Sequence, residues 1–334
     1  MTQTTMPPRM TAPHPKTMRA AVLASPGTFD VGEVAVPVPA AGEVRVRIEG
    51  CGVCASNIPP FEGREWFRYP MKAGQLGHEA WGVIDAVGAD VTRFKRGDRV
   101  AFLSECAYAE CDVAEQSKVV ALPEALADRP FPGEPLGCAI NIFRRSNVRA
   151  GQTVAIVGVG FLGALLTQLA ARAGARVIAI ARRPYAQEVA IRSGAAMVIE
   201  MDEHAQIIDQ VRDLTGGQFC DVVIECVGKQ WPLDLAGELT GERGRMVVAG
   251  YHQDGPRTCN MQMWNWRGIE VINAHERDVR TYIDGMQAAV EAVSAGTLDP
   301  WPLYTHVFPL EGLAEALTMT RDRPDGFMKA LIRM

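Results

Sequence analysis

The sequence has no apolar run long enough to cross a membrane and no surplus of basic residues. A membrane-spanning helix needs about 20 predominantly apolar residues in succession, and no stretch of this chain reaches that length. The net charge of −5 leaves no basic excess with which to neutralise the phosphates of a nucleic acid. We therefore expect neither a membrane nor a nucleic acid as a partner.

We also expect neither a secretory signal nor a disulfide framework. Residues 1–16 are rich in Thr, Pro and Met but contain no apolar signal segment, so we predict a mobile tail over residues 1–17. The eight cysteines are scattered over 334 residues, which favours thiols that are free or bound to metal. Such thiols are typical of a reducing compartment, and we expect a cytoplasmic protein.

The apolar pattern that is present changes near the middle of the chain. Alternating runs such as residues 43–49 predict β-strands, here with Val44, Val46 and Ile48 on one face and Arg45 and Arg47 on the other. From about residue 154 to residue 296, strand and helix patterns alternate, which predicts an α/β fold with a parallel, doubly wound sheet. The last residues return to short strands around one helix, expected over 310–319.

Three glycines, Gly158, Gly160 and Gly163, follow an apolar strand pattern in the spacing G-x-G-x-x-G. Residues 164–173 after them predict a helix. In a strand–turn–helix unit the first glycine allows the turn, the second lets a pyrophosphate approach the backbone, and the third lets the helix pack closely on the strand. The alternative is an ordinary glycine-rich turn, but the long series of strand–helix units favours a dinucleotide. We include Phe161 and Leu162 in the predicted cofactor loop.

The β-rich part contains residue types that bind zinc, namely Cys54, His78 and Glu79, and Glu134 follows later. A catalytic zinc site needs three protein ligands and one open position. Taken singly, Cys54 can be a buried thiol and His78 a structural histidine. Their joint presence ahead of a nucleotide-binding unit favours a metal site.

Five motifs, in their order along the chain, resemble those of the medium-chain dehydrogenase/reductase superfamily. They are Cys54-x-Ser56, Gly77-His78-Glu79, Gly97-Asp98-Arg99-Val100, Glu134-Pro135-Leu136 and the glycine motif. The fourth is most similar to the zinc-dependent polyol (sorbitol) and threonine dehydrogenase branch. The resemblance implies a Rossmann dinucleotide-binding domain over residues 144–296 and a GroES-like β-barrel catalytic domain made of residues 18–143 and 297–334.

The resemblance also assigns roles to residues near the metal motif. It implies that Cys54 and His78 bind a catalytic zinc, that Glu134 holds the third-ligand position, and that Glu79 binds the metal or lies behind it. Cys138, one helical turn after Glu134, is an alternative third ligand. Ser56 matches a hydroxyl that relays the substrate proton.

A second metal is not expected. Relatives with a structural zinc carry four closely spaced cysteines after the Gly-Asp-Arg-Val motif, whereas this chain has only Cys106 and Cys111 there. Two thiols cannot close a tetrahedral site. We therefore expect one catalytic zinc per chain and no structural zinc.

The residues after the predicted strand 176–181 bear on the choice of cofactor. Relatives that use NAD carry an acidic residue there for the adenosine ribose, but this chain has Ala181 followed by Arg182 and Arg183. Two guanidinium groups can bind a 2′-phosphate, so we expect NADP(H) to be favoured, with NAD(H) possible. Alternatively, the arginines only solvate the strand end. Val227-Gly228 and Ala249-Gly250 end two predicted strands, where the resemblance implies the nicotinamide contacts of the family; alternatively, the glycines only form loops.

These features predict a zinc-dependent oxidoreductase that transfers hydride between the hydroxyl of a secondary alcohol, polyol or sugar (or its ketone) and NAD(P). We expect a homodimer or homotetramer. The alternatives are a zinc-independent quinone or enoyl reductase of the same superfamily, which would lack the Cys54–His78 pair, and a non-catalytic cofactor-binding protein, which would have damaged ligands. The polar and aromatic residues considered for the substrate pocket are Trp66, Phe67, Tyr251, His252, Asn265, Trp266, Asn273, His275 and Glu276.

Overall fold

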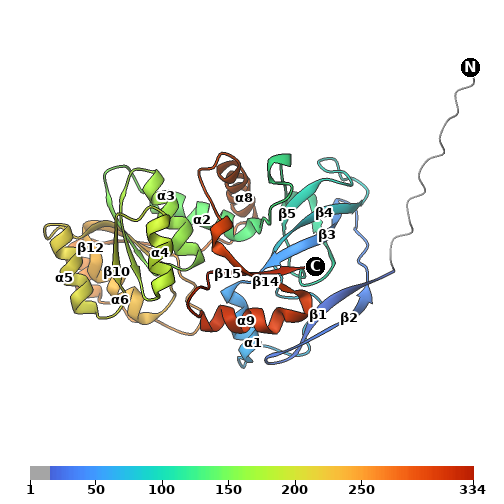
Figure 1. Cartoon of the computed structure of the whole chain (residues 1–334), viewed down its shortest axis with the longest axis horizontal. Coiled ribbons are helices and arrows are strands. Elements are labelled where there is room, and N and C mark those ends of the chain that lie inside the picture. The colour runs from blue at the N-terminus through green and yellow to red at the C-terminus, as the bar shows by residue number, and fades with distance from the viewer. Residues whose placement is uncertain (1–15) are drawn as a thin grey trace, which may run out of the picture.

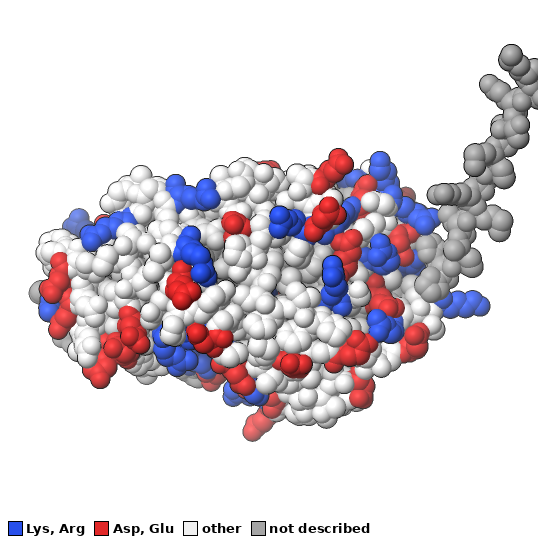
Figure 2. Space-filling model, in the orientation of Figure 1, with Lys and Arg blue, Asp and Glu red and all other residues white. Residues whose placement is uncertain are grey.

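The computed structural model describes residues 16–334, which form two lobes side by side (Figure 1). Most of the predicted tail, residues 1–15, lies outside the described residues, and strand β1 already begins at Thr17. In the described part of the chain no helix has the length and apolar composition to cross a membrane. Acidic and basic side chains are interspersed over the face shown in Figure 2.

One lobe is built on a six-stranded parallel sheet with the order β10-β9-β8-β11-β12-β13. Numbered along the chain this is 3-2-1-4-5-6, the order of doubly wound nucleotide-binding sheets, and it reverses between β8 and β11. The predicted parallel sheet is therefore confirmed. Its strands are β8 (Thr153–Val157), β9 (Arg176–Ala181), β10 (Met197–Glu200), β11 (Cys220–Glu225), β12 (Thr240–Val248) and β13 (Glu270–Asn273).

Helices cover both faces of this sheet, which is why its central strand is a continuous apolar run. Val154 and Ile156 of β8 pack in one core with four helices, and Ala155 and Val157 pack in a second core with two others. The first group is α2 (Gly133–Ser146), α3 (Phe161–Arg172), α4 (Pro184–Arg192) and α8 (Val279–Ser294); the second is α5 (His204–Leu214) and α6 (Gln230–Leu239).

The other lobe is a β structure that joins both ends of the described chain. Its main sheet has the order β14-β15-β3-β4-β5-β7, β6 pairs with β3, and β1 and β2 form a separate hairpin. Because β15 pairs with β3, the last strands complete the sheet begun by the first ones. The limits that we assign to the two domains remain a prediction. The strands are β1 (Thr17–Ser25), β2 (Thr28–Ala35), β3 (Glu43–Gly52), β4 (Glu79–Val87), β5 (Arg99–Leu103), β6 (Cys111–Glu115), β7 (Val119–Ala121), β14 (Tyr304–Pro309) and β15 (Lys329–Arg333).

The burial of residues in strand β3 follows the alternating pattern of its sequence on one face but not entirely on the other. Val44, Val46 and Ile48 are buried, as predicted. On the opposite face Arg45 is also buried, because its Nε and Nη2 bind the two carboxylate oxygens of Asp85 at 2.8 and 3.0 Å. A paired arginine can therefore occupy a core position that the sequence pattern alone does not reveal.

Two helix starts differ from the prediction. Helix α3 begins at Phe161 rather than at residue 164, because Gly160 is the last extended residue and its carbonyl already accepts the N–H of Ala164. Helix α9 (Leu313–Asp322) begins three residues later than predicted, because Leu310–Gly312 form a 3-10 turn. The remaining short helices are α1 (Ile58–Glu62) and α7 (Met261–Arg267).

Candidate active site

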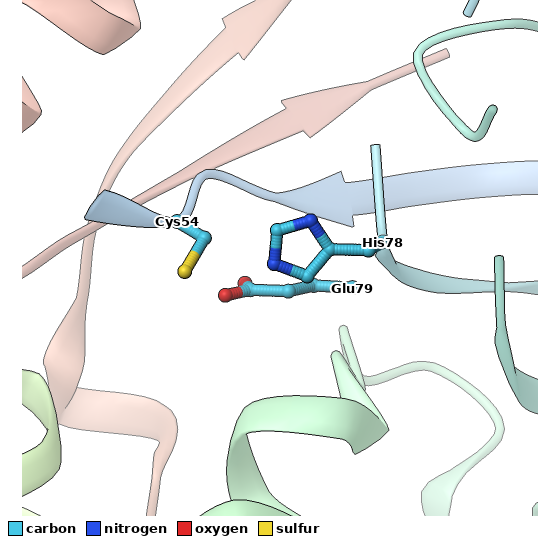
Figure 3. Close-up of side chains that lie close together, drawn as sticks. All are labelled: Cys54, His78 and Glu79. Carbon is cyan, nitrogen blue, oxygen red and sulfur yellow. The ribbon is translucent and has the colours of Figure 1, made fainter. Parts of the chain in front are cut away.

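Cys54, His78 and Glu79 come together at one end of strands β3 and β4 (Figure 3). Cys54 follows β3, and Glu79 opens β4 in register with Gly52. One ligand atom from each residue (a sulfur, a nitrogen and an oxygen) lies within 4.8 Å of the other two. Among residues 16–334 this is the one group of at least three His, Cys, Asp or Glu side chains with such geometry. Strand pairing thus unites two separate sequence motifs in a donor set that suits zinc.

The ring of His78 is oriented by the backbone of Leu76. Its Nδ1 lies 2.8 Å from the Leu76 carbonyl oxygen and donates to it, so Nε2 is directed to the cluster. Burial lowers the pKa of His78, but the hydrogen bond with Cys54 and the negative charges of Cys54, Glu134 and Glu79 outweigh burial and raise that pKa to about 10. The electrostatic field at the cluster therefore favours a cation.

Glu79 is fully buried and forms an ion pair with Lys329 of β15. The Lys329 Nζ lies 2.7 Å from Oε1 and 2.6 Å from Oε2, and only the bond to Oε1 is well aligned. Gly52 makes room for this carboxylate, since a Cβ there would lie 1.8 Å from Oε2. Lys329 also sits 5.0 Å from the centre of the Phe161 ring. The buried Lys329 ammonium therefore contacts both Glu79, of the predicted metal ligands, and Phe161, which directly follows Gly160 of the glycine motif.

Glu134 lies outside the group of mutually close ligand atoms. It stands in the first turn of α2, where its Oε1 accepts a hydrogen bond from the Cys138 thiol at 3.1 Å. Burial raises the pKa of Glu134, and the positive charge of His78 opposes that rise. Glu134 and Cys138, the two candidates for the third ligand, are thus hydrogen-bonded to each other, and Glu134 is close enough to His78 for the charge of His78 to affect its pKa. Which of them completes the ligand set remains a prediction.

The loop after Cys54 is fixed by Asn57. The buried Asn57 amide donates to the Leu76 carbonyl at 3.1 Å and to the Tyr108 hydroxyl at 2.9 Å. It thereby ties the Cys54 loop to the residues before His78. Ser56 is half-buried in the same 3-10 turn, where it lies along the chain between Cys54 and the hydrogen-bonded Asn57. Its relay role remains a prediction.

The three motif glycines are required for different reasons. Gly158 has a left-handed φ of +95°, and a Cβ there would lie 2.3 Å from Val227. A Cβ at Gly163 would lie 2.1 Å from the Gly158 carbonyl oxygen. At Gly160, by contrast, a Cβ would meet no heavy atom within 4 Å. The open space above Gly160, at the N-terminus of α3, fits the pyrophosphate of a dinucleotide.

The glycine motif allows a paired test. We expect Gly160→Ser to leave the free energy of unfolding nearly unchanged, because the site is open and serine is a good helix N-cap. The same variant should weaken cofactor binding at least about tenfold, since its side chain occupies the pyrophosphate space. Gly163→Ala, the control, should lower the free energy of unfolding by about 1–3 kcal/mol through overpacking. Chemical denaturation and cofactor titration check both variants; unaltered cofactor binding by Gly160→Ser would contradict the assignment.

The two arginines after β9 are placed differently. The Arg183 Nη1 donates to the carbonyls of Pro324 and Phe327 at 3.0 and 2.6 Å, so this guanidinium is already engaged by the other lobe. Arg182 is exposed, and no hydrogen bond or ion pair of its side chain occurs within residues 16–334. Of the two predicted phosphate ligands, Arg182 is the one that is free.

A buried carboxylate, Glu225, lies where β11 and β12 end, and it was not among the residues predicted from the sequence. Glu225 is fully buried; its Oε1 accepts the N–H groups of Val227 and Gly228, each at 2.7 Å, and its Oε2 lies 3.0 Å from His252 Nε2. The signal for it was a glutamate that closes an apolar strand. Glu225 thus holds together the turn that includes Val227 and Gly228 and, through its backbone carbonyl, the N–H groups of Ala249 and Gly250.

His252 was a predicted pocket residue, but both of its ring nitrogens are occupied. Its Nε2 faces Glu225 and its Nδ1 accepts from Arg257 Nε at 3.0 Å. Glu276 is similarly engaged, because its carboxylate accepts the N–H groups of Arg277 and Asp278 at the start of α8. We therefore interpret both as residues that fix loops.

The aromatic candidates for the substrate pocket are mostly exposed. Trp66 is 63% exposed and packs near Phe67, with ring centres 5.9 Å apart. Tyr251 and His275 face each other at 5.8 Å, whereas Trp266 on α7 is 87% exposed. Asn265 and Asn273 are exposed as well. A surface cavity of about 400 Å³ between α3 and α4 contains none of these residues, so it is separate from the predicted site.

Comparisons with known proteins bear on the family. Residues 40–139 match the alcohol dehydrogenase GroES-like domain, and residues 162–295 match the zinc-binding dehydrogenase family. Sorbitol dehydrogenase from Halalkalibacterium halodurans is 30% identical over 299 residues, covering 78% of this chain and 84% of the relative. The chain belongs to the zinc-type alcohol dehydrogenase superfamily.

Other members of this superfamily resemble the chain at similar levels. The 2-dehydro-3-deoxy-L-galactonate 5-dehydrogenase of Pseudoalteromonas atlantica is 27% identical, with 91% of this chain and 95% of the relative covered. Human quinone oxidoreductase is 28% identical, with 85% and 87% covered. Two solved structures share the fold: a zinc-binding dehydrogenase from Sinorhizobium meliloti bound to NADP (23% identity, TM-score 0.81, 95% and 99% covered) and an Escherichia coli alcohol dehydrogenase with NADH (22%, 0.84, 96% and 100%).

Membership in the zinc-type alcohol dehydrogenase superfamily settles the coarser predictions. The resemblance to the polyol branch and the fold class, a Rossmann sheet with a GroES-like lobe, are confirmed. The protein is an oxidoreductase of this superfamily. Because its relatives include both polyol dehydrogenases and quinone oxidoreductases, the family alone does not fix the substrate.

Proposed function

We propose that the protein is a zinc-dependent dehydrogenase that interconverts a secondary alcohol, polyol or sugar hydroxyl and its ketone with a nicotinamide cofactor. The observation that carries this proposal is the convergence of Cys54, His78 and Glu79 beside the glycine loop, to which Lys329 links them. A sulfur, a nitrogen and an oxygen donor in a partly buried setting fit Zn²⁺. We also propose the domain limits, the dimeric or tetrameric assembly and the cytoplasmic location predicted from the sequence.

Each residue of the cluster has a role in this proposal. Cys54 and His78 would hold the metal, and the Leu76 carbonyl keeps the His78 ring in orientation. Either Glu134 or Cys138 would supply the third ligand. Bound zinc supplies Lewis acidity toward the substrate oxygen, and the nicotinamide supplies the hydride acceptor or donor.

Removal of the substrate proton is assigned to Ser56. Its hydroxyl would accept the proton of the substrate hydroxyl and pass on its own. The resemblance to the family implies that the histidine that continues this relay in alcohol dehydrogenases would fall at Pro59, so the second step has no imidazole at that position. Water or a ribose hydroxyl of the cofactor would complete the transfer.

The experiment that tests this function is a panel of secondary alcohols, polyols, sugars and quinones, assayed with both cofactors before and after treatment with a zinc chelator. We expect oxidation of a hydroxyl substrate that is abolished by the chelator and restored by added zinc. Quinone reduction that survives chelation would instead support the zinc-independent alternative, which the similarity to quinone oxidoreductases brings into consideration.

NADP(H) is the cofactor that we propose, with Arg182 as the residue that binds the 2′-phosphate. We expect the wild-type kcat/KM to be higher with NADP(H) than with NAD(H). Replacement of Arg182 by glutamine should lower kcat/KM for NADP(H) about tenfold or more, which is the size of one lost charge-assisted hydrogen bond, and should leave NAD(H) nearly unaffected. Steady-state kinetics with both cofactors measure this. Equal or better use of NAD(H) by the wild type would contradict the preference.

A further inference from the structure

The loop of residues 251–258, between β12 and α7, is fixed to the lobe that contains the parallel sheet. The Arg257 Nη2 donates to the Gly228 carbonyl at 3.0 Å and to the Asp254 carboxylate. The Arg257 Nε donates to His252, whose other ring nitrogen faces the buried carboxylate described above. The loop is therefore held to the turn that follows β11.

One side chain of this loop reaches the β lobe. The half-buried Gln253 donates from its Nε2 to the Ala55 carbonyl at 3.4 Å. Within residues 16–334, no other side chain of the 251–258 loop has a hydrogen bond or ion pair with the β lobe. Gln253 is thus the residue through which the loop is bonded to the β lobe.

Ala55 lies between two residues of the predicted active site. It follows Cys54, whose sulfur points toward the other two residues of the cluster (Figure 3), and it precedes Ser56. Its carbonyl also accepts the N–H of Ile58 within the 3-10 turn. A hydrogen bond to this carbonyl therefore restrains a predicted metal ligand and the predicted proton acceptor together.

The turn to which the loop is held lies beside the glycine motif. Val227, which precedes Gly228, lies against Gly158, since a Cβ added at Gly158 would be 2.3 Å from the Val227 side chain. The sheet order reverses between β8 and β11, and ligands of such sheets bind outside the carboxyl ends of the strands at that point. A nicotinamide must lie between the glycine motif and the metal if its pyrophosphate is at Gly160 and it exchanges hydride with a substrate at the metal. The 251–258 loop connects these two places.

We propose that Gln253 is a positioning residue, which holds the Cys54–Ser56 turn in place relative to the nicotinamide through the Ala55 carbonyl. This inference rests on the proposed function, because it presupposes hydride transfer between a nicotinamide and a substrate at the metal. Such a transfer needs the reacting atoms about 3–3.5 Å apart, so a small displacement of the turn slows it. One hydrogen bond changes an equilibrium about three- to tenfold, and we expect effects of that size.

The test replaces Gln253 by methionine, which is similar in length but has no donor, in the full-length zinc-loaded protein. Hydrogen–deuterium exchange of residues 54–58, without and with NADPH, reports on the turn directly. We expect exchange about three- to tenfold faster than in wild type, because the N–H groups of Asn57 and Ile58 bond within this turn.

A kinetic measurement shows whether the turn matters for the reaction. In single turnovers of the preferred alcohol and its carbinol-deuterated form, the isotope-sensitive rate of nicotinamide reduction should fall in Gln253→Met about three- to tenfold. The zinc content, the melting temperature and the dissociation constant of NADPH should stay close to those of wild type. A merely structural role would change the last three and leave the isotope-sensitive step unaffected.

Gln168→Met is the matched control. Gln168 on α3 also bonds to a distant segment, because its Nε2 donates to the Asp299 carbonyl and its Oε1 accepts the Asp299 N–H, both at 2.8 Å. These two residues line the surface cavity of about 400 Å³, which contains no residue of the metal cluster. Gln168→Met should therefore leave the exchange of residues 54–58 and the rate of hydride transfer within about twofold of wild type.

The outcomes separate this inference from the proposed function. Unchanged exchange of residues 54–58 in Gln253→Met overturns the inference, and so does faster exchange with an unaltered rate of hydride transfer. Equal changes in Gln168→Met also overturn it, since they indicate a general loosening between distant segments. If the wild type oxidises no alcohol, the proposed function fails, while the exchange measurement still decides whether Gln253 holds the turn.

Discussion

Replacement of Cys54 by alanine is expected to remove the metal and to lower kcat with the preferred alcohol by at least about 1,000-fold. The sulfur is one of the three donor atoms that lie within 4.8 Å of one another, and its loss would leave only His78 and the third ligand, Glu134 or Cys138, to hold the metal. Metal ions contribute several kcal/mol of transition-state stabilisation, and about 4 kcal/mol corresponds to that factor in rate. The measurements are metal content by mass spectrometry and steady-state kinetics.

Two other cysteines extend this experiment, Cys51 as a control and Cys138 as a test of the third ligand. Cys51 is fully buried three positions earlier, and burial raises the pKa of its thiol, so Cys51→Ala should keep both the metal and most of the activity. Cys138→Ala decides between the two candidates for the third ligand. Retained zinc in that variant favours Glu134, whereas lost zinc assigns the position to Cys138. If Cys54→Ala kept full zinc content and full activity, the metal site described above would be wrong.

The second large effect is expected from the buried ion pair of Glu79 and Lys329. Replacing Lys329 by methionine leaves a fully buried carboxylate without its counter-charge. Removal of one partner of a buried pair costs about 3–5 kcal/mol, so the metal-free variant should lose that much free energy of unfolding. The double variant Glu79→Gln/Lys329→Met should recover a large part of the loss, because no unpaired charge then remains.

Comparison of the metal-free and zinc-loaded forms makes this prediction sharper. If Glu79 faces the bound cation, zinc compensates its charge, and Lys329→Met should cost clearly less stability in the zinc-loaded protein. The same linkage requires Lys329→Met to bind zinc more tightly than the wild type. Denaturant titrations of the wild type, Lys329→Met and the double variant, each in both forms, measure these differences. An equal loss with and without zinc would show that Glu79 does not sense the metal.

The sequence predicted those features that are encoded by neighbouring residues. The glycine loop is one, because turn, strand and helix all lie within a few positions of Gly158 and each glycine has a local reason. Cys54 and His78 are another, because their residue types and motifs indicate zinc even though strand pairing brings them together. The parallel sheet also followed from the local alternation of strands and helices.

Features that depend on distant partners could not be predicted in this way. Arg183 was a candidate phosphate ligand, but its guanidinium is used by carbonyls of residues more than a hundred positions later. His252 was a pocket candidate until Glu225 and Arg257 were found to occupy both of its nitrogens. Lys329 was missed because its importance comes from Glu79, which lies on a strand at the other end of the chain. In each case the partner is set by tertiary packing, for which the local pattern carries no signal.

The central claim is that one zinc ion per chain is needed for alcohol oxidation. The most direct measurement is the activity of metal-free protein titrated with zinc, with bound metal counted in the same samples. We predict that alcohol oxidation is absent without zinc and rises in proportion to bound metal up to one equivalent per chain, where it reaches a plateau. Full activity of the metal-free protein, or a plateau reached only at two equivalents, would contradict this account.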